Sequence, residues 1–330
     1  ISSNGVADLS KDTYKWNGQE FVTDFTLLKT QIDRIYNSGF GVQQIVLDNP
    51  SWAFQRDENG NLPNNNYVVS TYGNAEPPVD FNAWANYLRE VMEFLVDNYG
   101  EEEMLKVQFG VGREIGTGGH WSGSQEAFFD FYERSINTIR SVLPGAKVGS
   151  HFLWGSARNS WGPDFVRWCS SNNIDYDFVG VSYYPAYDRA RRTNFEEVYA
   201  KDFGVIKDIP EWDNTARLQI HEFALTQTFG GNTFEIAPRE HQNSFLVGMM
   251  KMFYENDMEN LNLWGQGNQY FPVSQELLDL KGHSYHTSTK NGVQNSENNY
   301  VDAIFTSNKS QNKYNIMAYN YNANPSSNVS

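Results

Sequence analysis

The chain has 330 residues, of which 39% are hydrophobic and 15% aromatic. This length and composition allow one large core of barrel size. The formal net charge of −15 disfavours nucleic acid and anionic membranes as partners. The single Cys169 excludes an internal disulfide, and the 6 histidines have no metal-binding spacing, so we expect neither metal nor cofactor.

The sequence has no apolar run long enough to cross a membrane, and it begins at Ile1 without a signal-type segment. We expect a secreted or periplasmic protein whose signal segment has been removed.

Apolar runs and helical periodicities alternate along the first part of the chain. Alternating units of this kind predict a parallel sheet, and their number favours a closed (β/α)₈ barrel whose first strand lies near Ile1. The expected helices are 24–37, 81–99, 124–143, 162–172 and 240–256, and the expected strands are 41–48, 106–111, 147–154, 178–182, 218–223 and 261–264.

The composition changes at about residue 275, where Asn, Ser and Lys become frequent and helical periodicity ends. Two β-like segments follow, at 300–306 and 314–321. We therefore divide the chain into a barrel domain, 1–274, and accessory strands, 275–330, that form part of a β-sandwich.

Two glutamates stand at the ends of predicted strands, Glu114 and Glu222. In a barrel of parallel strands, the residues that carry the chemistry lie at these carboxyl ends. Glycoside cleavage needs two carboxyl groups, of which one protonates the leaving oxygen and the other attacks or activates water. The pair therefore predicts a glycosidase, and the high aromatic content favours a carbohydrate ligand.

The chain resembles glycoside hydrolase family 39, a family of retaining barrel enzymes. The similar segments are Pro77–Trp84, Leu95–Gly100, Phe128–Tyr132, Ala146–Gly149, Tyr176–Gly180 and His221–Phe223, which keep the family's order over about residues 5–270. The resemblance implies that Glu114 is the general acid/base and Glu222 the nucleophile. It also implies that Tyr184 contacts the nucleophile.

Two segments depart from the family pattern. The family has Asn before the acid/base, whereas this chain has Arg113, and the sixth-strand segment is Val181–Pro185. An arginine suits the oxygens of sulfate or carboxylate. Arg113 therefore either binds an anionic sugar or pairs with a catalytic glutamate, and Arg189, Arg191 and Arg192 either assist it or form a solvated helix start.

Further binding candidates lie at or just past strand ends. His151 and His120 are expected to bond substrate or to pack in the core rather than to carry a proton. The tryptophans are expected either to stack on sugars or to pack in the core: Trp52, Trp121, Trp154 and Trp264.

Three functions stay open at this point. The first is a retaining glycoside hydrolase acting on a polysaccharide or oligosaccharide, with an anionic algal galactan such as carrageenan as the candidate polymer. The second is a β-xylosidase-like enzyme on neutral glycans, and the third is a carbohydrate-binding barrel without catalysis. A dinucleotide-binding enzyme is disfavoured because no Gly-x-Gly-x-x-Gly follows an early strand.

Overall fold

The chain forms two compact units, and each is described by itself. The first comprises Ile1–Trp154, Arg158–Gly180 and Pro210–Ala216, and the second Gly155–Ala157, Val181–Ile209 and Arg217–Ser330. The computed structural model describes residues 13–17, 19–47, 59, 69–70, 73–117, 119–153, 160–185, 195–228, 235–236, 239–264, 271–280, 282–286, 293–296 and 299–322.

The main sheet has six strands in the order β12-β9-β8-β7-β6-β3. The pairs β3–β6, β6–β7 and β9–β12 are parallel. Each strand thus neighbours the next one along the chain in this sheet, as repeated βα units require. The strand expected near Ile1 lies outside the described residues.

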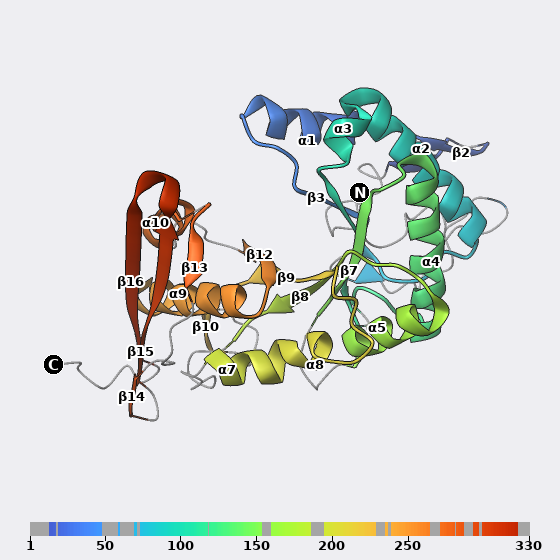
Figure 1. Cartoon of the computed structure of the whole chain (residues 1–330). Coiled ribbons are helices and arrows are strands. Elements are labelled where there is room, and N and C mark those ends of the chain that lie inside the picture. Colours follow the sequence, from blue (N-terminus) through green and yellow to red (C-terminus); the bar gives the residue numbers. More distant parts are fainter. Residues whose placement is uncertain are drawn as a thin grey trace. The chain divides into compact units, whose positions relative to one another are not determined.

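The first unit contains the strands and helices up to the start of β8, and its helices are labelled in Figure 1. They are β1 (Tyr14–Trp16), β2 (Phe21–Thr23), α1 (Thr26–Asn37), β3 (Gln44–Leu47), β4 (Val69–Ser70), β5 (Gly73–Asn74), α2 (Phe81–Tyr99), α3 (Glu101–Met104), β6 (Gln108–Ile115), α4 (Gln125–Val142), β7 (Lys147–Phe152), α5 (Trp161–Asn172) and β8 (Phe178–Tyr183).

Helix α2 begins and ends where its sequence provides caps. The Asp80 carboxylate accepts from the backbone N–H of Asn82 at 2.8 Å, and Gly100 ends the helix at a φ of 85°. The helix lies beside α4 (Figure 1), where Trp84 Nε1 donates to Ser135 Oγ at 2.9 Å. Burial of these two amphipathic faces places α2 and α4 together against the core.

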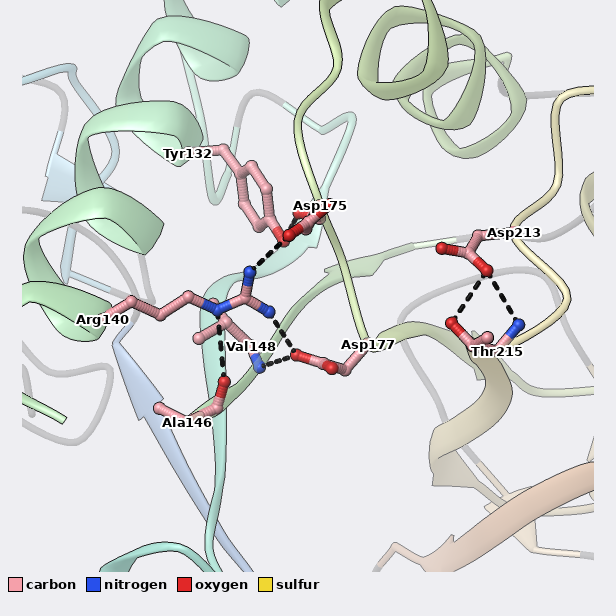
Figure 2. Close-up of polar contacts among 8 residues, drawn as sticks. All are labelled: Tyr132, Arg140, Ala146, Val148, Asp175, Asp177, Asp213 and Thr215. Carbon is pink, nitrogen blue, oxygen red and sulfur yellow. Dashed lines mark hydrogen bonds and ion pairs between the residues drawn. The ribbon is translucent and has the colours of Figure 1, made fainter. Parts of the chain in front are cut away.

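Arg140, near the end of α4, joins the segments that precede β7 and β8. Its Nη1 and Nη2 donate to Asp175 at 2.8 Å and Asp177 at 3.0 Å, and its Nε donates to the Ala146 carbonyl at 3.4 Å (Figure 2). Asp177 also accepts from the Val148 backbone N–H at 2.6 Å. We call these five residues the Arg140 network.

The second unit contains the end of β8, the helices and strands that follow it, and the carboxyl-terminal sheet. Its elements are α7 (Phe195–Val198), the π-helical turn η3 (Tyr199–Phe203), α8 (Gly204–Lys207), β9 (Arg217–Phe223), β10 (Thr226–Thr228), β11 (Glu235–Ile236), α9 (Arg239–Glu255), β12 (Met258–Leu263), α10 (Phe271–Leu278), β13 (Ser284–His286), β14 (Val293–Ser296), β15 (Asn299–Asn308), the 3₁₀ turn η5 (Lys309–Gln311) and β16 (Lys313–Asn322).

Strands β13 to β16 form an antiparallel sheet whose longest pair is β15–β16 (Figure 1). The ammonium group of Lys251, on α9, forms a buried ion pair with Asp302 of β15. The pair links this sheet to α9. Separating the two groups would leave each charge buried without compensation, which is unfavourable.

The predicted helices and strands recur in the structure with shifts of a few residues, and 81–99 matches α2. The stretch from α7 to α8 was anticipated only as the helix start that was one interpretation of Arg189, Arg191 and Arg192, and α10 crosses the composition change at residue 275. The division after residue 274 stays a prediction. Among the helices that the structure describes, none is both long and apolar enough to cross a membrane.

Candidate active site

Strand β6, which carries the first candidate carboxylate, is bulged at its carboxyl end. It pairs with β7 at Val111–Ser150 and next at Ile115–Phe152. Three residues of β6 therefore lie opposite one residue of β7, His151, which is 2% exposed. A bulge of this kind changes the direction in which the strand presents its side chains.

The backbone of the bulge is left-handed at two positions. Gly112 has a φ of 79° and Glu114 a φ of 48°. A side chain at position 112 would also collide with Ile115, since an added Cβ would lie 2.7 Å from its Cγ1. The conformation at Glu114 costs on the order of 1 kcal/mol, and such strain concentrates at functional sites.

The carboxyl group of Glu114 contacts an imidazole. His120 Nε2 lies 2.9 Å from Glu114 Oε2, and the two side chains are 4% and 12% exposed. Sequence reasoning placed His120 near the cleft but did not pair it with this glutamate. The contact is shielded from water, which strengthens its electrostatic component.

The loop that presents His120 is held at several points. The backbone N–H groups of His120 and Trp121 donate to the Thr117 carbonyl at 3.1 and 2.9 Å. Trp121 is 3% exposed; its Nε1 donates to the Ser124 carbonyl at 3.1 Å, and its ring packs edge-on against Phe128. This placement favours the core-packing interpretation of Trp121 over sugar stacking.

The second candidate carboxylate, Glu222, belongs to the second unit. It stands near the end of β9, half-buried, and its Oε2 accepts from the Tyr184 hydroxyl at 2.6 Å. Tyr184 meets the ring of Trp264 edge-on, with centroids 6.0 Å apart, and Trp264 is 47% exposed. The structure thus brings three of the predicted site residues together, and Trp264 presents an aromatic surface to solvent.

A neutral histidine precedes Glu222 on the strand. His221 Nε2 lies 2.8 Å from Gln219 Oε1. Burial lowers the pKa of His221 from 6.5 to about 4, so its imidazole is uncharged near neutral pH. The amide oxygen can only accept, so we assign the proton to Nε2.

The remaining predicted site residues fall into two groups. Arg113 lies in the β6 bulge with its Nε and Nη2 atoms buried. Trp52, Trp154, Arg189, Arg191 and Arg192 lie outside the described residues. Over the part of the chain that the structure describes, no group of three His, Cys, Asp or Glu side chains could hold a metal ion.

The fold alternates parallel strands with helices, and two of the strands carry a glutamate at the carboxyl end. This arrangement is that of barrel hydrolases that work through carboxyl groups. Comparison with known proteins gives the family. The family described as glycosyl hydrolases family 39 matches residues 63–223.

Two curated relatives and a solved structure are similar to the chain. An alpha-1,4-L-rhamnosidase from Formosa agariphila is 60% identical over 98% of this chain and 68% of its own length. A beta-xylosidase from Geobacillus stearothermophilus is 28% identical over 46% of this chain and 30% of its own length.

The crystal structure of a monomeric beta-xylosidase from Caulobacter crescentus has a TM-score of 0.60 at 15% identity, and the match covers 89% of this chain and 64% of that one. The chain belongs to glycosyl hydrolase family 39, and it is a glycoside hydrolase with the family's (β/α)-barrel type of fold.

Proposed function

We propose that the protein hydrolyses α-1,4-linked L-rhamnosyl bonds of a polysaccharide or oligosaccharide. The observation that carries this proposal is the 60% identity to an alpha-1,4-L-rhamnosidase over 98% of the chain. The β-xylosidase alternative is supported by a relative that is 28% identical over 46% of the chain. The higher and more extensive identity favours the rhamnosyl substrate.

In this proposal Glu114 is the general acid/base and Glu222 the nucleophile, and the anomeric configuration is retained. The strained backbone at Glu114 and the hydroxyl of Tyr184 on Glu222 support these roles, because both fix a carboxyl group in a defined orientation. Glu222 would form the covalent glycosyl intermediate, and Glu114 would protonate the leaving oxygen and then activate water.

We also propose that the glycan is anionic and that Arg113 binds its sulfate or carboxylate. The support is the place of Arg113, next to Glu114 in the β6 bulge, and the bidentate geometry that a guanidinium offers to such groups. A sulfated galactan such as carrageenan is the alternative polymer with the same charge chemistry. Such a polymer is extracellular, so we propose that the protein acts as a secreted or periplasmic enzyme.

The substrate is tested with purified protein on three probes: an α-1,4-linked L-rhamnosyl oligosaccharide, carrageenan, and a xylo-oligosaccharide. New reducing ends and the released sugar are measured, with Glu114→Gln as the inactive control. We expect rhamnosyl cleavage to be the fastest by a wide margin. Cleavage of the xylo-oligosaccharide or carrageenan alone would contradict the proposed specificity.

The charge is tested with Arg113→Ala on a sulfated rhamnosyl oligosaccharide and its desulfated form. A charge-assisted pair at a desolvated site contributes roughly 1.5–3 kcal/mol, so kcat/KM should fall about tenfold to hundredfold on the sulfated probe. The loss on the desulfated probe should be much smaller. Equal losses on both would show that Arg113 acts on the catalytic carboxyl groups instead.

A further inference from the structure

We propose that His120 is a positioning residue for the general acid/base: it binds Oε2 of Glu114 and thereby orients the carboxyl group that protonates the glycosidic oxygen. The inference rests on the proposed role of Glu114. It starts from the contact between His120 Nε2 and Glu114 Oε2, which measures 2.9 Å between two buried side chains.

The contact joins two groups whose positions are fixed independently. Glu114 is held by the β6 bulge, in which its φ of 48° is left-handed. His120 is held by the turn at Thr117 and by its neighbour Trp121, whose ring packs 5.5 Å from Phe128 and 5.2 Å from Phe131. A hydrogen bond between preorganised groups needs little additional ordering, so more of its free energy is available to the reaction.

The chemistry of the acid step explains what this bond does. We assign a hydrogen to His120 Nε2, which donates to Glu114 Oε2. When the glycosidic bond breaks, the proton of Glu114 moves to the leaving oxygen, and a carboxylate forms. The N–H bond from His120 then becomes charge-assisted and therefore stronger.

A bond that strengthens as the charge develops lowers the energy of the transition state more than that of the bound substrate. In the second half of the reaction the carboxylate takes a proton from the attacking water, which restores the carboxyl group. The imidazole keeps its own proton throughout, and every proton that Glu114 loses returns from water. His120 therefore acts through Glu114 and touches neither the sugar nor the water.

The experiment compares His120→Leu, which removes the donor, with His120→Gln, whose amide nitrogen reaches the position of Nε2. Both are assayed for kcat/KM on an α-1,4-linked L-rhamnosyl oligosaccharide and on dinitrophenyl α-L-rhamnoside. The first probe has a leaving group that must be protonated, whereas dinitrophenolate departs without a proton. A bond acting through the acid step should therefore affect the two probes differently.

We expect His120→Leu to lower kcat/KM about tenfold to hundredfold on the oligosaccharide and much less on the dinitrophenyl probe. His120→Gln should restore most of the loss, and the Leu substitution should add nothing in a Glu114→Gln background. If His120→Leu does not fold, His120→Asn replaces it, because its amide is too short to reach Oε2.

Three results would overturn the proposal: equal losses on the two probes, a further loss in the Glu114→Gln background, or unchanged activity in the Leu variant. Failure of the proposed function has a different result, because Glu114→Gln alone would then keep its activity on the oligosaccharide.

Discussion

The two ends of the parallel strands are built differently. At the amino ends of β7 and β8, Arg140 forms ion pairs with both Asp175 and Asp177 (Figure 2). At the carboxyl end of β6, the strand is bulged, and Glu114 is held in a left-handed conformation beside a buried imidazole. At the amino ends the polar groups thus bond to one another, whereas at the carboxyl end of β6 a strained residue holds an ionisable group beside an imidazole.

The difference shows how a barrel separates stability from chemistry. Charged groups at the amino ends join neighbouring segments of the fold, whereas those at the carboxyl ends are available to a substrate. Substitutions at the carboxyl ends should therefore change rates, and substitutions at the amino ends should change the free energy of unfolding.

The largest effect is expected for the two glutamates. Glu114→Gln should lower kcat roughly 10²–10⁴-fold, since it removes general acid/base catalysis, and Glu222→Gln at least as much, while both variants stay folded. In wild-type protein, NMR of the first product should show the anomeric configuration preserved. A first product of the opposite anomer, or near-normal activity in either variant, would contradict these roles.

Azide distinguishes the two roles from each other. In Glu222→Gly it can replace the nucleophile and attack directly, which gives a glycosyl azide of inverted configuration. In Glu114→Gly it can replace water in the second step, which gives a glycosyl azide of retained configuration. The opposite assignment of products would show that the two roles are exchanged.

A smaller effect is expected at Tyr184. Its hydroxyl donates to Glu222 at 2.6 Å, so Tyr184→Phe removes a charge-assisted bond from the carboxylate. We expect kcat to fall about tenfold to hundredfold with the free energy of unfolding little changed. Tyr183→Phe is the matched control, because the Tyr183 hydroxyl donates to Asp202 at 3.2 Å and not to Glu222. Equal rate losses in the two variants would argue against a specific contact with the nucleophile.

The sequence predicted the periodic parts of the molecule well. Helix α2 was expected at 81–99 because its apolar residues recur at helical spacing. The start of β12 was missed because Glu259 and Asn260 are consecutive exposed polar residues, which interrupt the apolar alternation there. The extent of the helical stretch from α7 to α8 was not predicted, and this stretch is interrupted by a π-helical turn.

The candidate site was predictable only in part. Strand ends located Glu114 and Glu222, and the family resemblance supplied the contact of Tyr184 with Glu222. The contact between Glu114 and His120 depends on a left-handed residue within a strand and on a loop held by Trp121. Neither feature has a local periodicity, so neither could be derived from the sequence.

A moderate effect on stability is expected from the buried His221, which lies next to Glu222 at the carboxyl end of β9. Burial lowers its pKa from 6.5 to about 4. Below about pH 6.5 the unfolded chain therefore binds a proton at His221, whereas the folded chain does not. The contribution of His221 to the free energy of unfolding is present above that pH and is lost as the pH falls toward 4. Between pH 7 and pH 5 the loss should be about 2 kcal/mol.

The measurement is urea unfolding of wild-type protein and of His221→Gln at pH 7 and pH 5. A glutamine does not titrate, so the difference between the two pH values should be smaller in the variant by about 2 kcal/mol. The comparison cancels every group that the two proteins share. The same pH difference in both would show that His221 is protonated alike in the folded and unfolded chains.

The smallest effect is expected at the amino ends. Arg140→Met removes bonds to Asp175 and Asp177, but the Arg140 side chain is 28% exposed and Asp175 76%, so water screens part of the attraction. The Asp177 carboxylate would still accept from the Val148 N–H, which limits the cost. We expect a loss of about 1 kcal/mol in the free energy of unfolding, with kcat unchanged.

The matched control for this substitution is Arg167→Met. Arg167 pairs with Asp164 three residues earlier on α5, at 3.1 Å, so its ion pair joins no distant segments. Such a pair contributes only about 0.3 kcal/mol. Urea unfolding should therefore rank Arg140→Met below Arg167→Met in stability, while both keep wild-type turnover on the rhamnosyl oligosaccharide. A fall in kcat for Arg140→Met would show that the amino ends also shape the chemistry, because the Arg140 network would then be coupled to the carboxyl ends of the same strands.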